Sequence, residues 1–159
     1  MYVMARFKQR SIPQRVALGA VAGAAATMVM QAMMMTSAKF LPGSKPPMKQ
    51  DPAKFMLDKV PVELPEPVRP WAEKSLQLGY GMTSGAIYGA LRARRGSPVF
   101  DGALLGIGVW AAGYLGWLPA ADLMPPITEH EPQQIAVPFV QHALFGVAVA
   151  AAYDGLMRI

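Results

Sequence analysis

Four long stretches of the sequence contain no charged residue. They cover residues 16–38, 75–91, 102–121 and 132–153, which together make up just over half of the 159-residue chain. A helix that crosses a lipid bilayer needs about 17–25 mostly apolar residues, and each stretch falls within that range. The pattern predicts an all-α membrane protein with four transmembrane helices. It excludes a soluble globular enzyme, a secreted disulfide-linked domain and a disordered tail.

Charged and proline-rich segments separate the expected helices. The helices are expected over residues 16–38, 71–93, 102–118 and 135–153. The other segments are a basic N-tail (1–15), a proline-rich connection (39–70), a basic loop (94–101), a second loop (119–134) and a C-tail (154–159). Eight prolines between residues 39 and 75 exclude a long helix there, because proline removes a backbone donor and clashes with the preceding turn. Only residues 51–60 could form a short helix in that connection.

The positions of lysine and arginine predict that both termini lie in the cytoplasm. The N-tail carries four of these residues and residues 92–102 carry three, whereas residues 119–134 carry none. Because basic residues accumulate on the cytoplasmic side of membrane proteins, we expect an N-in, C-in topology. Seven lysines and arginines between residues 39 and 75 oppose this orientation. The first apolar stretch is longer than the core of a signal peptide, about 7–15 residues, so we expect it to be retained as a helix.

An alignment of the chain with itself suggests two repeated helical hairpins. The second and fourth expected helices align at an offset of 65 residues, and the first and third align at an offset of 86. The difference of 21 between the offsets equals the difference in length between residues 39–75 (37 residues) and residues 119–134 (16 residues). Two tandem hairpins would form a parallel repeat about an axis along the membrane normal. The alternative is that helices rich in alanine and glycine align by chance. At the first offset, Tyr80-Gly81 falls on Phe145-Gly146 and Tyr88 falls on Tyr153.

Small residues recur at a spacing of four in every expected helix. This spacing places them on one helix face, where two backbones can approach closely and gain dispersion contacts. We therefore predict helix packing through these positions, and we expect Leu at Gly85 to overpack the face while Ala is tolerated. The predicted packing residues are Gly19, Gly23, Gly81, Gly85, Gly89, Gly102, Gly106, Gly146 and Ala150.

The sequence offers few groups that could carry chemistry. It has no cysteine, which excludes disulfides, Cys-ligated zinc and iron–sulfur clusters. No Asp, Glu, Lys or Arg lies near the centre of an expected span, although ion-coupled transporters usually place such groups there. We expect no enzyme activity, no metal and no cofactor. His142 is the only histidine in an expected span; it is a weak candidate ligand for haem or a pigment, and such a histidine more often hydrogen-bonds a neighbouring helix.

The net charge of +5 indicates membrane lipids and not nucleic acid as the partner. The basic residues flank apolar spans and are not interleaved with exposed aromatic residues, as they are in many nucleic-acid-binding surfaces. Basic residues at the ends of membrane helices instead meet anionic lipid headgroups.

Several short motifs resemble those of a known family. They are LGAVAG in the first helix, KFLPGSKPP after it, GALLGIGVWA in the third helix, and MPPITEHEP followed by QHALFG. Together they resemble the YagU-like family of bacterial inner-membrane proteins over about residues 11–158. The resemblance implies a multi-pass helical protein of the bacterial inner membrane, and it supplies no catalytic residues.

Three functions fit the sequence. In the first, the chain acts by helix packing, as an accessory or structural subunit of a larger membrane complex or as a homo-oligomer. In the second, it is a small transporter or channel with a pore between repeats or protomers. In the third, it is a subunit that binds a cofactor through His142. The polar side chains that could line a thin pore are those of Gln31, Thr27, Thr83, Ser84, Tyr88, His142 and Tyr153.

The topology can be tested by labelling. Cysteines introduced at Ser97 and Thr128 should react with a membrane-impermeant reagent from opposite sides of the membrane, with Ser97 on the cytoplasmic side, because the two loops differ so strongly in basic residues. Labelling of both positions from one side would contradict the predicted topology.

Overall fold

The computed structural model describes residues 10–92 and 97–159, which are helical apart from short connections and contain no β-strand. The predicted N-tail falls mostly on residues 1–9 and the predicted basic loop mostly on residues 93–96, outside the described residues. The long helices are α1 (Ile12–Phe40), α3 (Arg69–Leu91), α4 (Pro98–Ala111) and α6 (Pro132–Met157), and α2 (Pro52–Asp58) is a short helix in the proline-rich connection. A π-helical segment, η2 (Ala112–Trp117), joins α4 to the short α5 (Leu118–Ala120). Single 3-10 turns lie at η1 (Pro42–Ser44) and η3 (Ile127–Glu129).

Local sequence signals set the starts of these helices. The Ser11 and Glu131 backbone N–H groups donate to the Gln14 and Gln134 side chains, three residues later, as in a capping box. Each of these helices also has a proline in its first turn, where the missing N–H costs nothing. The Asp51 carboxylate accepts hydrogen bonds from the N–H groups of the first turn of α2. Caps of this kind explain why α1 and α6 begin three or four residues before the helices expected at residues 16 and 135.

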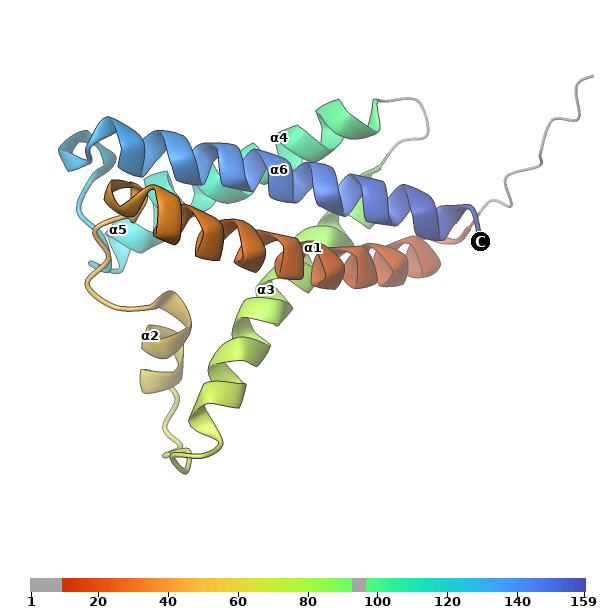
Figure 1. Ribbon diagram of the computed structural model, residues 1–159. Coiled ribbons are helices and arrows are strands. Elements are labelled where there is room, and N and C mark those ends of the chain that lie inside the picture. The colour runs from red at the N-terminus through yellow and green to blue at the C-terminus, as the bar shows by residue number, and fades with distance from the viewer. Residues whose placement is uncertain (1–9, 93–96) are drawn as a thin grey trace, which may run out of the picture.

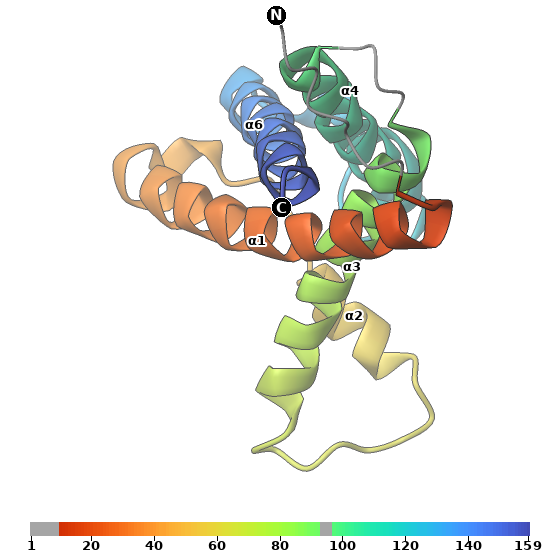
Figure 2. The same cartoon turned by 90° about the vertical axis from the view of Figure 1, so that its right-hand side faces the viewer.

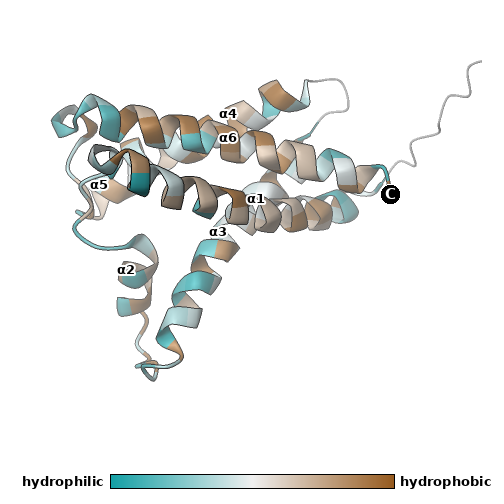
Figure 3. Cartoon of the chain, viewed as in Figure 1, coloured by the Kyte–Doolittle hydropathy of each residue, from teal (hydrophilic) through white to brown (hydrophobic). Residues whose placement is uncertain are grey.

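Three helical stretches are long and apolar enough to cross a membrane. They are α1, the continuous stretch Pro98–Ala120 and α6. The remaining predicted span, over residues 71–93, forms α3. This helix has sufficient length but is not among these three, because charged residues in its first turns and the glycines and polar residues after them make it less apolar. Figure 3 shows apolar residues along α1, α4 and α6, and more polar residues on α2 and the first turns of α3.

The helices are arranged as two crossing pairs that share one interface. α1 packs against α3, α4 packs against α6, and α1 also packs along α6. Figure 1 shows α1, α4 and α6 side by side, with α3 projecting away from them toward α2. Seen from the side in Figure 2, α3 again leaves the other three helices. Within the described residues, α6 therefore contacts both α1 and α4, and α3 crosses α1 with its C-terminal half while its first turns lead away from the other long helices.

The contacts between the two hairpins are not symmetric. α1 packs along α6, whereas α3 and α4 make only a few contacts. A two-fold axis would make these two interfaces equivalent. Tyr88 and Tyr153, which the predicted repeat makes equivalent, do contact each other edge to face, with ring centroids 5.5 Å apart. The predicted hairpin repeat stays a prediction.

Two hydrophobic clusters fill the interior. The first lies between α1, α3 and α6 and is built on Tyr88, Phe145, Val149 and Tyr153. The second lies under the loop that follows α5 and is built on Trp110, Tyr114, Leu118, Leu123 and Met124. The first cluster lies beside the helix crossings, and the second holds residues 119–134 against α4 and α6.

Candidate functional site

The crossing of α1 and α3 brings five predicted packing glycines together. Gly19 and Gly23 on α1 face Gly81, Gly85 and Gly89 on α3, and all five are buried. A Cβ atom added at any of them would come closer than 3 Å to an atom of the other helix. The two backbones are thus in direct contact, which only glycine permits at this separation.

The crossing of α4 and α6 repeats this arrangement with a second set of residues. Gly102 and Gly106 face Gly146, and a Cβ at any of the three would overlap the backbone of the opposite helix. A Cβ at Gly102 would also lie 2.8 Å from the Cβ of Ala150. All of the predicted packing residues therefore lie at one of the two crossings.

The expectation that alanine is tolerated at Gly85 is wrong for this geometry. A Cβ at Gly85 would lie 2.7 Å from both Cα and N of Gly23, and it would also overlap the carbonyl oxygen of Gly19. These are backbone atoms, which cannot rotate away. A single methyl group therefore forces the helices apart.

Arg15 joins the start of α1 to the end of α3. Its guanidinium donates to the carbonyl oxygens of Gly89 (3.0 Å), Ala90 (2.8 Å) and Arg92 (2.7 Å). The last carbonyls of a helix have no partner within the helix and carry partial negative charge. Arg15 supplies hydrogen-bond donors to these carbonyls at the end of α3. Its bonds thereby set the register of α1 against α3.

Arg92 extends this contact to the other two long helices. Its guanidinium forms an ion pair with Asp101 in the first turn of α4 and lies 3.8 Å from the carboxylate of Asp154 near the end of α6. It also lies over the ring of Tyr88, 5.7 Å from the centroid. Only 9% of the Arg92 side chain is exposed. Ends of all four long helices thus meet at one place, which we call the Arg92 junction (Arg15, Arg92, Asp101, Asp154).

Two adjacent polar residues in the N-terminal half of α6, Gln141 and His142, have different roles. The Gln141 carboxamide donates to Ser37 Oγ (2.8 Å) and to the carbonyl of Met33 (3.3 Å) on α1. The His142 Nδ1–H donates to the carbonyl of Pro138 in its own helix, at 2.7 Å. The interhelical hydrogen bond expected for His142 is therefore made by Gln141.

Both histidines of the chain contact Tyr114. The centroid of the Tyr114 ring lies 6.5 Å from that of His130 and 6.0 Å from that of His142. His130 Nε2–H donates to the carbonyl of Pro125 at 3.1 Å, and His130 Nδ1 is buried without a hydrogen-bond partner. Within residues 10–92 and 97–159, no group of three or more His, Cys, Asp or Glu side chains could hold a metal ion. Tyr114, His130 and His142 thus form an aromatic cluster that holds the loop of residues 119–134 against α6.

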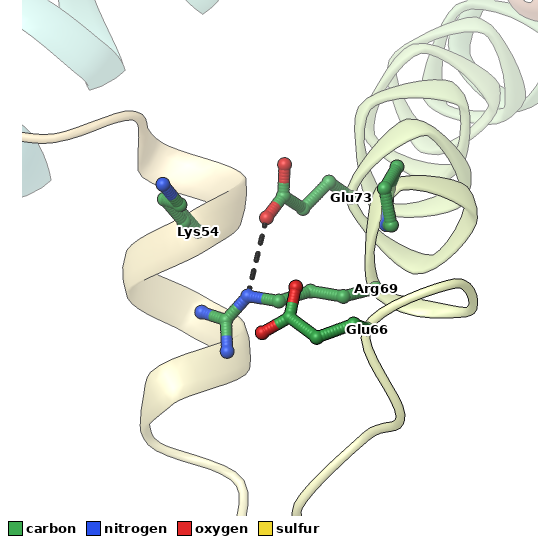
Figure 4. A pocket seen from close by; sticks show the side chains of 5 residues that line it. Lys54, Glu66, Arg69 and Glu73 are labelled. Atoms are coloured by element: carbon green, nitrogen blue, oxygen red, sulfur yellow. Dashed lines mark ion pairs between the residues drawn. The ribbon is translucent and has the colours of Figure 1, made fainter.

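A hollow of about 470 Å³ lies between α2 and α3 and has charged walls (Figure 4). Lys54 faces it from α2, Glu66 from the connection, and Arg69 and Glu73 from α3. Arg69 is paired with Glu73 at 3.5 Å and with Asp58. The bond to Arg69 holds the pKa of Asp58 below its ordinary value. Because the folded pKa is the lower one, this contact favours the α2–α3 arrangement at neutral pH and is lost as the pH falls below about 4.

Sequence reasoning named the small residues that lie at the crossings, but it indicated neither which helices cross, nor the Arg92 junction, nor the shared contact with Tyr114. One signal for the junction was present, because Arg15, Asp101 and Asp154 each stand at an end of an expected span on the predicted cytoplasmic side. No comparable signal indicates that His130 and His142 approach the same ring.

Comparisons with protein-family models, with curated protein sequences and with solved structures give no match. The resemblance to the YagU-like family stays a prediction that rests on its short motifs.

The crossing of α1 and α3 can be tested with a matched pair of substitutions. Gly85→Ala should lower the free energy of unfolding by about 1–3 kcal/mol, the usual cost of overpacking. Gly108→Ala is the control, because a Cβ at Gly108 meets nothing within 4 Å and alanine is the better helix former. Unfolding of the two variants in detergent, followed by circular dichroism, measures the difference. Equal or greater stability of Gly85→Ala would contradict the close approach at this crossing.

Proposed function

We propose that this chain is a four-span protein of the bacterial inner membrane, with both termini in the cytoplasm, that acts by helix packing and not by catalysis. It would serve as an accessory or structural subunit of a larger membrane complex or as a homo-oligomer. The observation that carries the proposal is the direct backbone contact at the two crossings. There the positions of the helices are determined by the close fit of one backbone against another.

The positions of the helix ends support a membrane crossing by α3. α1 begins at the Arg92 junction and ends near the other end of α6, where Ser37 meets Gln141. The chain then returns to the junction at Arg92 before α4 begins. If α1, α4 and α6 cross the membrane, residues 41–91 must cross it as well. α3 is the one long helix in that segment, and its 23 residues are enough to cross the hydrocarbon layer.

The hydroxyl groups near the crossings do not favour the transporter alternative. Thr27 donates to the carbonyl of Gly23, Thr83 to Gly79 and Ser84 to Tyr80, each within its own helix. Thr27 and Ser84 are also buried. A hydroxyl group that is hydrogen-bonded within its own helix contributes little polarity to a transport pathway between helices.

Labelling of the proline-rich connection tests the fourth span. A cysteine at Val62, which is 59% exposed, and a cysteine at Ser97 should react from opposite sides of the membrane, because α3 lies between them. If both react from the same side, α3 does not cross and the four-span proposal fails.

The native mass of the protein tests the packing role. An affinity-tagged chain extracted from its own membranes in a mild detergent should migrate in a particle that contains at least one further polypeptide. Native mass spectrometry identifies whether that polypeptide is another copy or a different protein. A particle with one chain and only lipid and detergent would overturn the proposed role as a subunit or homo-oligomer.

A further inference from the structure

The hollow between α2 and α3 has the size of a small-molecule site and walls of both charges. Its volume of about 470 Å³ falls within the range of about 300–1,000 Å³ that such sites occupy. Lys54 and Arg69 bring positive charge to it, and Glu66 and Glu73 bring negative charge. Figure 4 shows these side chains directed into the space from α2, from the connection and from α3. A simple anion or a simple cation would face like charge here, whereas a ligand with both charges would not.

Only part of this charge is used within the fold. Arg69 Nη2 pairs with Asp58, and Arg69 Nε lies 3.5 Å from the carboxylate of Glu73. The Nη1 end of the same guanidinium takes part in neither contact. The Lys54 ammonium and the Glu66 carboxylate form no ion pair and no side-chain hydrogen bond with the described residues. The hollow therefore offers a ligand two donor groups, Lys54 Nζ and Arg69 Nη1, and one acceptor group, the Glu66 carboxylate.

The side chains beside the hollow are typical of a membrane surface. Trp71 follows Pro70, which lines the hollow, and is 70% exposed. The Lys74 ammonium lies over the Trp71 ring, 5.4 Å from its centroid. Tryptophan is enriched at the level of the lipid headgroups, and lysine near a helix end extends its ammonium to the same level. In the proposed four-span arrangement the first turns of α3 lie at the outer membrane surface, so the hollow is level with the headgroups there.

We propose that this hollow binds phosphoethanolamine, supplied as the headgroup of a membrane lipid. The phosphate accepts hydrogen bonds from Lys54 Nζ and Arg69 Nη1, since lysine and arginine are the usual partners of phosphate groups. The primary ammonium, joined to the phosphate by a short ethyl chain, carries three N–H donors and faces the Glu66 carboxylate. One ligand thus satisfies both unpaired charges of the hollow, which neither free phosphate nor a simple amine does. The lipid source rests on the proposed four-span arrangement, whereas recognition of the zwitterion does not.

Binding of three lipids with the same short acyl chains tests the headgroup. The purified protein in detergent is titrated with phosphatidylethanolamine, phosphatidylglycerol or phosphatidylcholine, and native mass spectrometry measures the bound fraction. Phosphatidylethanolamine should bind about tenfold more tightly than the other two, because phosphatidylglycerol has no cation and the quaternary nitrogen of phosphatidylcholine has no N–H to donate to Glu66. Equal binding of all three lipids would overturn the proposal. Tighter binding of phosphatidylglycerol would also overturn it, because positive charge alone would then explain the binding.

Substitutions in the hollow test the two halves of the ligand separately. Glu66→Gln should weaken binding of phosphatidylethanolamine by about tenfold without weakening that of phosphatidylglycerol, because only the ammonium faces Glu66. Lys54→Gln should weaken both. Glu63→Gln and Lys59→Gln are the matched controls, since both residues are exposed and neither lines the hollow. All four side chains are exposed, so circular dichroism should show unchanged helix content. An effect of Glu63→Gln as large as that of Glu66→Gln would overturn the proposal.

Soluble phosphoethanolamine distinguishes the source of the ligand. It should compete with the lipid only weakly, because it has no acyl chains; binding as tight as that of the lipid would overturn the lipid source and assign the hollow to a free zwitterion.

The labelling of Val62 and Ser97 separates this inference from the proposed function. Labelling from opposite sides, together with no preference for phosphatidylethanolamine, would leave the four-span proposal standing and overturn the headgroup site. Labelling from one side would overturn the four-span proposal and the lipid source, and binding of soluble phosphoethanolamine would then still support recognition by the hollow.

Discussion

Direct contact between helix backbones is the constraint on which the rest of the structure depends. Gly19, Gly23 and Gly85 leave no room for a side chain at the first crossing, and Gly106 and Gly146 leave none at the second. Helices that approach this closely gain many dispersion contacts, each of which is small. Because the fit is between main chains, it does not depend on side-chain rotamers. The positions of α3 and α6 against their partners are therefore set by a few residues.

Several polar groups beside these contacts are paired within the fold, and two buried ones are not. The hydroxyl groups of Thr27 and Ser84, which are buried near the first crossing, donate hydrogen bonds to backbone carbonyls one turn earlier in their own helices. Arg15 takes up the last carbonyls of α3, and Gln141 bonds to α1. Buried Tyr88 Oη and Trp110 Nε1 have no hydrogen-bond partner, and both lie where aromatic rings pack against each other.

Much of the helical architecture could be predicted from the sequence, because the spacing of charges and glycines is a local property. The uncharged stretches predict helices where α1, α4 and α6 are found, and the spacing of four predicts which glycines share a face. The divergence of α3 from α1 could not be predicted, since it depends on how the proline-rich connection and α2 position its first turns. The ion pairs of Arg92 with Asp101 and Asp154 could not be predicted either. The positions of charged residues indicate which of them lie at the same end of the expected helices, but not which of them come into contact. The contact of His130 and His142 with Tyr114 depends on the fold of the loop over residues 119–134, which has no periodic pattern.

The Arg92 junction has a consequence for the synthesis of the chain. Its members leave the ribosome in the order Arg15, Arg92, Asp101 and Asp154. Arg15 can meet the end of α3 as soon as that helix is inserted, and Arg92 can then meet Asp101 as α4 begins. Asp154 lies in the last turn of α6, so its ion pair with Arg92 forms only after the other three members of the junction have been made. The junction is thus completed only by α6, the last of these four helices in the order of the sequence.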